Sequence, residues 1–351
     1  MLDKVVIYRQ GSVIYGFAYV KGQLSYVTQD YDGFASEAVF NAKIIKVNHA
    51  EHSAFIEYAS GQIGFVNLAK GTRLQDGANL LVQLTWLGDE SKQAKFRTSV
   101  QLVGKYAVAT LSNQASVDCS RSPIHNRDAL SQAMLCHPAK WTLRSSVKQL
   151  SDIEPVMLEV EHIGGQLNKL ETLNKNGELI AGVPNYLKLL RSLPLVVDCF
   201  ITTNDKLVNE QLLSYQDCWL LDVIEYNPWL NMERELATYR ELLANTFYSL
   251  NNGASLEIHC LSGINLIDIN SDKAKLGRSQ LNFLVLDAIH QQICLRNLQG
   301  IILLDLLKNM TKAEQEQVLD YLKKLFKHDI TNTKVLGFSH SGLCELIRQK
   351  F

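Results

Sequence analysis

Short runs of β-branched and aromatic residues dominate the first third of the chain and predict a series of strands. Those before residue 38 fall at 5–8, 13–20 and 23–28, with turns at Gly11 and Gly22. Those after it fall at 39–47, 54–58, 64–68 and 80–86. Several short strands within about 60 residues, separated by polar turns, predict a small barrel or sandwich.

The last 120 residues alternate between strand and helix patterns. Apolar residues recur at helical spacing within 232–248, after Ser279 and after Thr311, which forms a capping-box sequence with Glu314. Strand-like runs occupy 255–259, 264–269, 301–304 and 334–338, and a helical end is expected over 342–350. This alternation predicts a βαβ arrangement with parallel neighbouring strands.

The middle of the chain is less informative. Residues 126–150 have a partly helical pattern, and residues 156–160 have the pattern of a strand. Neither a repeat nor a low-complexity tract appears between residues 106 and 210. The pattern alone therefore assigns no function to this region.

Composition places the 351-residue chain among ordinary globular proteins, with 46% hydrophobic and 20% charged residues. Its net charge of -1 argues against a general polyanion binder. The charge is unevenly distributed, however: residues 1–110 carry +2, residues 111–266 carry -6 and residues 267–351 carry +3. The two ends are therefore mildly basic, and only the middle is acidic.

The seven cysteines are scattered and form no C-x-x-C pair, which argues against a disulfide framework or a cysteine zinc site. The first residues contain no signal-peptide core, and no apolar run approaches the length of a membrane span. These features predict a cytoplasmic protein without a membrane span.

Two aspartates end consecutive apolar strands. Asp268 closes the segment INLID and Asp305 closes GIILLD, so a crossover helix between the strands would bring both to one sheet edge. Two carboxylates about 4 Å apart repel by roughly 4 kcal/mol at an effective dielectric of 20, which a Mg²⁺ ion would relieve. Asn270 lies two residues beyond Asp268 and is expected on the same side. The alternative is that each aspartate merely ends a strand.

Aromatic and basic residues suggest a second kind of site in the N-terminal third. Phe55 and Phe65 fall on neighbouring predicted strands, where they would either stack on bases or fill a core. Lys92, Lys95 and Arg97 follow the last of these strands and are either phosphate contacts or a solvated strand end. The nine histidines show no metal-ligand spacing.

Three C-terminal segments resemble the ribonuclease E/G family. They are GINLIDINSDKAKLGRS, ICLRNLQGIILLDLLKNM and GFSHSGLCELIRQKF, and they match the family's motifs in order and spacing. The segments FNAKIIKVNHAEHSAFIEYASGQIGFVNL and KFRTSVQLVGKYAVA resemble the family's RNA-binding OB-fold and the stretch after it. The resemblance is strong over 38–108 and 228–351 and weak between them.

The resemblance implies a mixed α+β and α/β chain in which an OB-fold barrel interrupts an RNase H-like subdomain. A sensor-like region and a DNase I-like catalytic subdomain would follow. The expected boundaries are 1–35 for the first RNase H-like part, 36–105 for the OB-fold, 106–181 for a degenerate 5′-sensor-like region, 182–243 for the second RNase H-like part and 244–351 for the catalytic subdomain.

The family also implies roles for individual residues. Asp268 and Asp305 match its metal-binding aspartates, and Asn270 matches its motif asparagine. Phe55 and Phe65 match its stacking aromatics. Lys92 matches its basic contact after the barrel, with Lys95 and Arg97 as close competitors.

The chain departs from the family pattern in three ways. Carboxylates in the segment VMLEVEHIG, residues 156–164, stand where the family has an Arg-Thr pair that holds a 5′-monophosphate, so sensing is expected to be lost. The sequence ends before the family's zinc-binding cysteine pair, so neither zinc nor a zinc-bridged dimer is expected. Residues around Leu261, Ser262 and Lys308 differ from the family's and are expected to alter activity.

The leading hypothesis is a Mg²⁺-dependent endoribonuclease that cleaves single-stranded RNA without sensing its 5′ end. Asp268 and Asp305 would hold the ion, and Asn270 would orient the attacking water or the phosphate. The alternative is a weakly active or non-catalytic RNA-binding protein that acts in rRNA maturation or as an RNA chaperone. The changed residues near the aspartates motivate this alternative, whereas the retained trio of Asp268, Asn270 and Asp305 argues against it.

Overall fold

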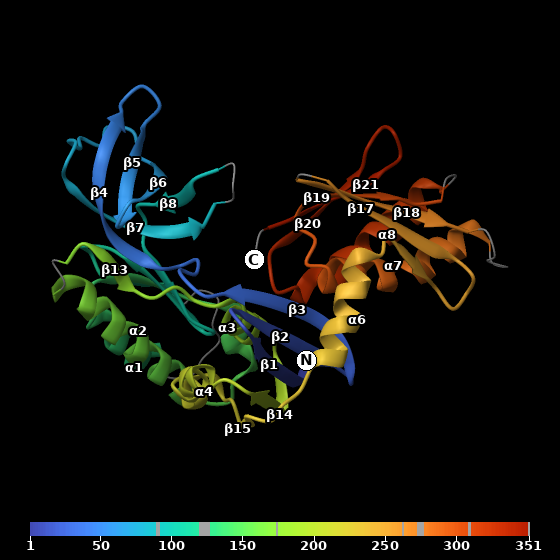
Figure 1. Ribbon diagram of the computed structural model, residues 1–351, viewed down its shortest axis with the longest axis horizontal. Helices are drawn as coiled ribbons and strands as arrows, with labels where there is room; N and C mark the ends of the chain where they lie inside the picture. The colour runs from blue at the N-terminus through green and yellow to red at the C-terminus, as the bar shows by residue number, and fades with distance from the viewer. Residues whose placement is uncertain are drawn as a thin grey trace. The chain divides into compact units, whose positions relative to one another are not determined.

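The computed structural model describes residues 1–88, 92–118, 127–172, 175–261, 263–271, 277–307 and 310–349. The chain forms two compact units (Figure 1). The first comprises Met1–Gln29, Ser192–Asn209 and Val223–Phe351, and the second comprises Asp30–Arg191 and Glu210–Asp222. The second unit therefore interrupts the first, because the chain leaves the first unit after its opening strands and later returns.

A closed five-stranded barrel forms one part of the second unit (Figure 1). Its strands pair in the order β4-β5-β6-β8-β7, and β7 pairs back with β4. The rings of Phe40, Tyr58 and Phe96 meet edge to face or tilted inside it. The barrel strands are β4 (Val39–Asn48), β5 (Ser53–Ala59), β6 (Gln62–Asn67), β7 (Asn79–Trp86) and β8 (Ala94–Arg97), and β13 (Gly177–Ile180) adds to the outside of β4.

The rest of the second unit packs around a small sheet in the order β11-β12-β10-β9. Its core combines the sheet's inner residues with one face of the long helix α2. The strands are β9 (Gln101–Val103), β10 (Ala107–Leu111), β11 (Ser116–Asp118) and β12 (Ala139–Leu143). The helices are α1 (Arg127–Leu135), the 3-10 turn η1 (Ser145–Gln149), α2 (Glu154–Thr172), α3 (Asn185–Ser192) and α5 (Gln216–Trp219).

The first unit contains two sheets. The five-stranded sheet has the order β15-β14-β1-β2-β3, so the first strands of the chain pair with strands that follow the interruption. Its strands are β1 (Leu2–Gln10), β2 (Val13–Val20), β3 (Gln23–Tyr31), β14 (Leu195–Thr203) and β15 (Val223–Tyr226). Helix α6 (Glu233–Ala244) completes this part, and the first residues of α4 (Lys206–Leu213), up to Asn209, also belong to the first unit.

The six-stranded sheet has the order β16-β17-β18-β19-β21-β20, and helices α7 and α8 pack on one of its faces (Figure 1). Its other face carries the more polar and exposed residues of each strand. The strands are β16 (Phe247–Ser249), β17 (Ser255–Leu261), β18 (Ile264–Asn270), β19 (Gly300–Asp305), β20 (Thr333–Phe338) and β21 (Cys344–Arg348). The helices are α7 (Arg278–Leu295), α8 (Lys312–Leu325) and the 3-10 turn η2 (Phe326–His328).

Two predicted elements have the opposite secondary structure. Residues 156–160 lie in helix α2, because Val156, Val160 and Ile163 are buried at helical spacing against the small sheet. Residues 342–350 contain strand β21 instead of a helix. Its buried residues alternate strictly, but one of them is Arg348, so a charged residue on the inner face concealed the strand pattern.

Strand β21 also changes the predicted sheet order. It lies between β19 and β20, so β20 pairs with β21 and not with β19. The predicted helix over 232–248 ends at Ala244, since the Asn245 side chain accepts a hydrogen bond from the Phe247 amide and turns the chain into β16. The parallel pair β18 and β19 joined by α7 agrees with the predicted βαβ unit.

The architecture is therefore mixed α and β with an OB-like closed barrel, as predicted. No helix in the described part of the chain has the length and apolar character that a membrane span requires.

Candidate active site and nucleic-acid interface

The two predicted aspartates lie side by side on the open face of the six-stranded sheet. Asp268 on β18 and Asp305 on β19 are register partners in a parallel pair. Neighbouring strands lie roughly 4.8 Å apart, so the two carboxylates leave the sheet from adjacent positions. Both are half-buried, and both lie at the carboxyl ends of their strands. The structure thus brings together the two residues that sequence reasoning paired.

The electrostatics of this pair favour a bound cation. The pKa of Asp268 is raised, first because partial burial disfavours its charged form and then because the negative charge of Asp305 opposes ionisation. Glu257 acts in the same direction, while His259 opposes it. A cation between the two aspartates would offset this repulsion.

Glu257 is a neighbour of the pair that sequence reasoning missed. It is the register partner of Asp268 in the antiparallel pair of β17 and β18, so Glu257, Asp268 and Asp305 form a row across three strands. The Glu257 carboxylate is 2.8 Å from His259 Nε2. The alternation of apolar and polar residues in β17 predicts its open face, but only the strand register decides that Glu257 lies opposite Asp268.

Asn270 also lies near the aspartates, as predicted. It is two residues beyond Asp268 at the end of β18, half-buried and on the same face. Of the residues that depart from the family pattern, Leu261 is exposed at the end of β17. Ser262 and Lys308 lie outside the described residues.

A buried amide holds the segment that follows Asp305. The Asn282 side chain on α7 donates to the Leu307 carbonyl (3.0 Å) and accepts from the Leu307 amide (2.9 Å). Asn282 is fully buried. These two bonds tie the crossover helix to the chain directly after β19, so Asn282 positions the end of the strand that carries Asp305.

The donor set suits a hard divalent cation. Mg²⁺ usually binds proteins through one or two carboxylates and keeps several waters. Asp268 and Asp305 provide two carboxylates at neighbouring positions. Within the described ranges, no three histidine, cysteine or acidic side chains gather as a closed ligand set. The two carboxylates suit an open Mg²⁺ site in which water would fill the other positions.

The barrel presents the second predicted set of residues. Phe55 on β5 and Phe65 on β6 are register partners, and their rings meet edge to face with centroids 5.8 Å apart. Phe55 is 38% exposed and Phe65 is half-buried, whereas Phe40, Tyr58 and Phe96 fill the interior. The pair therefore lies on the outside of the barrel, which removes core filling as the explanation for Phe55.

Strand register extends this pair into an aromatic row. Lys46 on β4 is the partner of Phe55, Lys95 on β8 is the partner of Phe65, and Trp86 on β7 is the partner of Lys95. The Lys95 ammonium lies 5.8 Å from the centre of the Trp86 ring. We call these five residues the aromatic row. Sequence reasoning missed Lys46 and Trp86, because only closure of the barrel makes them neighbours.

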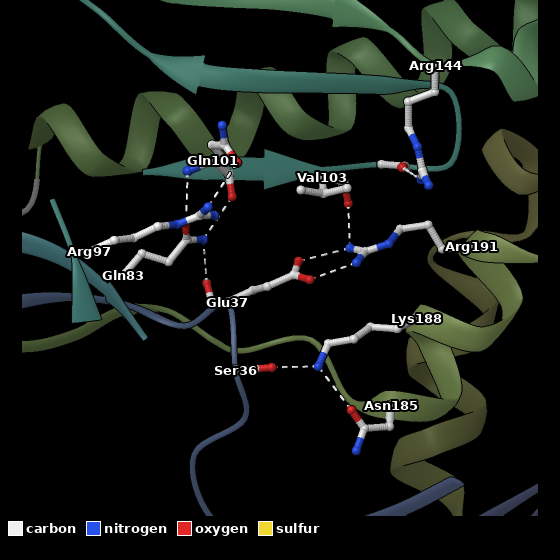
Figure 2. A network of polar contacts seen from close by, with 11 residues as sticks. Ser36, Glu37, Gln83, Arg97, Gln101, Val103, Arg144, Asn185, Lys188 and Arg191 are labelled. Atoms are coloured by element: carbon white, nitrogen blue, oxygen red, sulfur yellow. Dashed lines mark hydrogen bonds and ion pairs between the residues drawn. The ribbon is translucent and has the colours of Figure 1, made fainter. Parts of the chain in front are cut away.

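The other two predicted basic contacts differ from Lys95. Lys92 is exposed just before β8. Arg97 is half-buried and its guanidinium donates to Gln83 Oε1 (2.7 and 3.1 Å) and to Gln101 Oε1 (3.0 Å) (Figure 2). Arg97 therefore anchors β8 to the interior of the second unit, and its donors are engaged within the protein.

Glu159, in the segment compared with the family's sensor, is a buried carboxylate. It accepts hydrogen bonds from the backbone amides of Lys105 (2.5 Å), Tyr106 (2.8 Å) and Ala107 (2.8 Å) and from Trp219 Nε1 (2.7 Å). Burial raises its pKa, and these donors oppose the shift. Glu159 thus occupies a ring of N–H donors inside the protein, whereas Glu161 is exposed.

The sequence is similar to those of known ribonucleases E and G. Residues 226–351 match the family model for the ribonuclease E/G family. The chain is 21% identical to the putative ribonuclease E of Buchnera aphidicola subsp. Baizongia pistaciae, over 89% of this chain and 85% of that protein. It is 28% identical to Escherichia coli K12 ribonuclease G over 43% of this chain, and 20% identical to ribonuclease E of that strain over 89% of it. Each of these two matches covers 33% of the Escherichia coli protein.

Proposed function

We propose that the chain is a member of the ribonuclease E/G family and an endoribonuclease that cleaves single-stranded RNA with Mg²⁺. The observation that carries this proposal is the register of Asp268 and Asp305 at the carboxyl ends of two parallel strands. A ribonuclease fold that only bound RNA would have no need for two carboxylates that repel each other at this position.

In this proposal Asp268 and Asp305 hold the ion, and Asn270 orients the attacking water or the scissile phosphate. When bound, Mg²⁺ lowers the pKa of a coordinated water and offsets charge on the phosphate. Glu257 and His259, 2.8 Å apart, act on Asp268 in opposite directions, because Glu257 raises the pKa of Asp268 and His259 lowers it. Asn282 keeps the end of β19 in place.

The aromatic row is proposed as the surface that holds the RNA strand. Phe55 and Phe65 would stack on bases, and Lys95, Lys92 and Lys46 would contact phosphates. We further propose that residues 1–35 and 182–243 form an RNase H-like subdomain and that residues 244–351 form a DNase I-like one. The pairing of β1 with β14 across the interruption supports the first of these assignments.

The test is cleavage of a single-stranded RNA of about 20 nucleotides, followed with Mg²⁺ and with EDTA. We expect internal cleavage that depends on Mg²⁺. The alternative is a weakly active or non-catalytic RNA-binding protein that acts in rRNA maturation or as a chaperone. It is motivated by the departure from the family pattern around Leu261, which is exposed and pairs with Ile264 at the opposite end of the β17–β18 hairpin from Asp268. It predicts that the RNA is bound but stays intact in both conditions.

Replacing Phe55 with alanine is expected to weaken RNA binding by about 1–3 kcal/mol, because one base loses its stacking partner. The variant should remain folded, since Phe55 lies outside the barrel core. Fluorescence anisotropy with a labelled single-stranded RNA measures the change. Tyr226→Ala removes an exposed aromatic residue from the edge strand β15 and serves as the control. Unchanged affinity in Phe55→Ala would remove Phe55 from the interface.

We also propose that the protein does not sense a 5′-monophosphate. An arginine followed by a hydroxyl residue occurs at Arg144–Ser145, at the end of β12. The Arg144 guanidinium is half-buried and donates to the Gly104 carbonyl (2.5 Å) (Figure 2). The backbone amides from Lys105 to Ala107 already donate to the Glu159 carboxylate. An internal carboxylate therefore takes the donors that a phosphate would need.

RNAs with a 5′-monophosphate and a 5′-triphosphate are therefore expected to be cleaved at rates within about threefold of each other, since the sensing interactions, typically worth more than 1 kcal/mol, are absent. Arg144→Ala should leave this ratio unchanged, as should the control Lys140→Ala on the exposed side of β12. A strong preference for the monophosphate that disappears in Arg144→Ala would show that Arg144 senses the 5′ end.

A further inference from the structure

The second unit contains a cavity of about 260 Å³ that none of the proposed RNA contacts in the aromatic row lines. It lies where helix α2 faces strand β9, the segment after β13 and helix α5. Pockets for drug-sized ligands measure roughly 300–1,000 Å³, so this cavity suits a smaller ligand of one or two rings.

Three aromatic rings form one side of the cavity. His162 and Tyr215 have centroids 4.9 Å apart, and Tyr215 stacks on Trp219 at 4.2 Å with an angle of 23° between the planes. All three residues line the cavity. Trp219 is buried, and Glu159 accepts its indole N–H, so this wall is rigid. His162 is tilted by 51° from the plane of Tyr215, so aromatic surface borders the cavity at two angles, which favours a planar ligand.

Neutral polar groups complete the lining. Gln166 contacts His162 Nε2 through its amide nitrogen (3.3 Å), and Gln211 Oε1 accepts a hydrogen bond from the Tyr186 hydroxyl. In the described part of the chain no partner takes up Gln166 Oε1, the Gln211 amide nitrogen or the Tyr215 hydroxyl. By contrast, Gln83 and Gln101, which also line the cavity, already use their amides within the network of Figure 2.

Three charged residues line the cavity, and the two carboxylates among them are engaged within the protein. Glu37 forms an ion pair with Arg191 at 2.7 Å, and Glu159 is surrounded by its four N–H donors. His162 has a lowered pKa because burial disfavours the imidazolium and Lys169 repels it, so the ring is neutral at pH 7. Lys169 also lines the cavity and is exposed. The rest of the lining offers neutral polar and aromatic groups, which favour an uncharged ligand in its interior.

We propose that this cavity binds a nucleobase. A base is planar, uncharged and of the right size; it stacks on aromatic rings and forms hydrogen bonds with amide and hydroxyl groups along its edge. The base belongs either to the RNA strand or to a free nucleoside. The proposal can be tested without RNA cleavage, because binding is measured in EDTA. Absence of the proposed Mg²⁺-dependent cleavage would therefore leave the binding result unchanged.

The test uses calorimetry on the full chain with adenosine, guanosine, cytidine, uridine and inorganic phosphate, and anisotropy with a labelled 10-nucleotide RNA. Gln166→Leu keeps the side-chain volume but removes the amide. It should weaken nucleoside or RNA binding about tenfold through the lost hydrogen bonds. Gln132→Leu, on the exposed side of α1, is the matched control and should change neither. Tyr215→Phe is a second variant that keeps the stacked ring and removes only the unpartnered hydroxyl.

The outcomes distinguish the sources of the base. Two results would show that the site binds a base of the RNA strand. The first is a nucleoside that binds at a 1:1 ratio and displaces the RNA. The second is tenfold weaker RNA binding by Gln166→Leu when no nucleoside binds to the wild-type protein. A nucleoside that binds without displacing RNA would identify a separate ligand. Wild-type affinities in both Gln166→Leu and Tyr215→Phe, or binding of phosphate but of no nucleoside, would overturn the proposal.

Discussion

Asp305→Asn is expected to lower the rate of Mg²⁺-dependent RNA cleavage by about 10³-fold or more, since the loss of one metal-binding carboxylate removes several kcal/mol of transition-state stabilisation. Asp268→Asn should have the same effect, because the two residues are register partners at one site. Binding of single-stranded RNA, measured in EDTA, should stay within about twofold of wild type. Asp320→Asn on α8, an exposed residue paired with Lys323, is the matched control and should cleave normally.

A stability measurement separates loss of the metal from loss of the fold. In EDTA, Asp268→Asn should unfold at the same temperature as wild type or higher, because burial and Asp305 both disfavour the charged Asp268. Added Mg²⁺ should stabilise wild type, since a ligand that binds only the folded state raises its stability, and should not stabilise the variant. Normal cleavage by both asparagine variants would refute the proposed site.

Arg348→Leu is expected to lower the free energy of unfolding of the first unit by about 3–5 kcal/mol, the usual effect of removing one partner from a buried ion pair. Arg348 is fully buried in β21, and its Nε and one terminal nitrogen donate to the Asp329 carboxylate at 2.7 and 3.0 Å. Its other terminal nitrogen donates to Asn297 Oδ1 and the Leu298 carbonyl, both at 2.9 Å. The leucine would leave the buried Asp329 without a counter-charge.

Urea unfolding of the variant measures this effect. Lys323→Ala, which breaks the exposed pair with Asp320, should change stability by less than about 1 kcal/mol. Replacing Asp329 with leucine in the Arg348→Leu background should restore part of the lost stability, because no charge then remains buried. A loss below about 1 kcal/mol in Arg348→Leu would mean that water reaches this ion pair.

Sequence patterns predicted that the two aspartates lie side by side, but they did not predict what surrounds them. Two apolar runs that each end in aspartate, with a helix between them, predict that Asp268 and Asp305 share a sheet edge, because strands joined by a crossover helix run parallel and end at the same edge. Nothing local predicts Glu257. It reaches the site through the register of β17 against β18, and a shift of one residue would turn it to the other face.

The same limit explains the two misassigned elements. Arg348 sits at an inner position of β21 because Asp329, 19 residues away, offers a buried partner. Val156 and Val160 favour a strand locally. The segment is nevertheless a helix, because one face of α2 packs against the small sheet. On the barrel, sequence alone grouped Lys95 with Arg97, whereas the interior amides of Gln83 and Gln101 engage Arg97 only in the folded unit.

The sequence by itself determined the mixed architecture, the βαβ unit and the aspartate pair, because hydrophobic periodicity and strand-end chemistry are properties of short segments. Tertiary structure alone decided the Glu257 neighbour, the aromatic row that joins Lys46 to Trp86, the burial of Glu159 and the cavity beside His162. Each of these depends on the register or closure of segments distant along the chain, which local patterning does not specify.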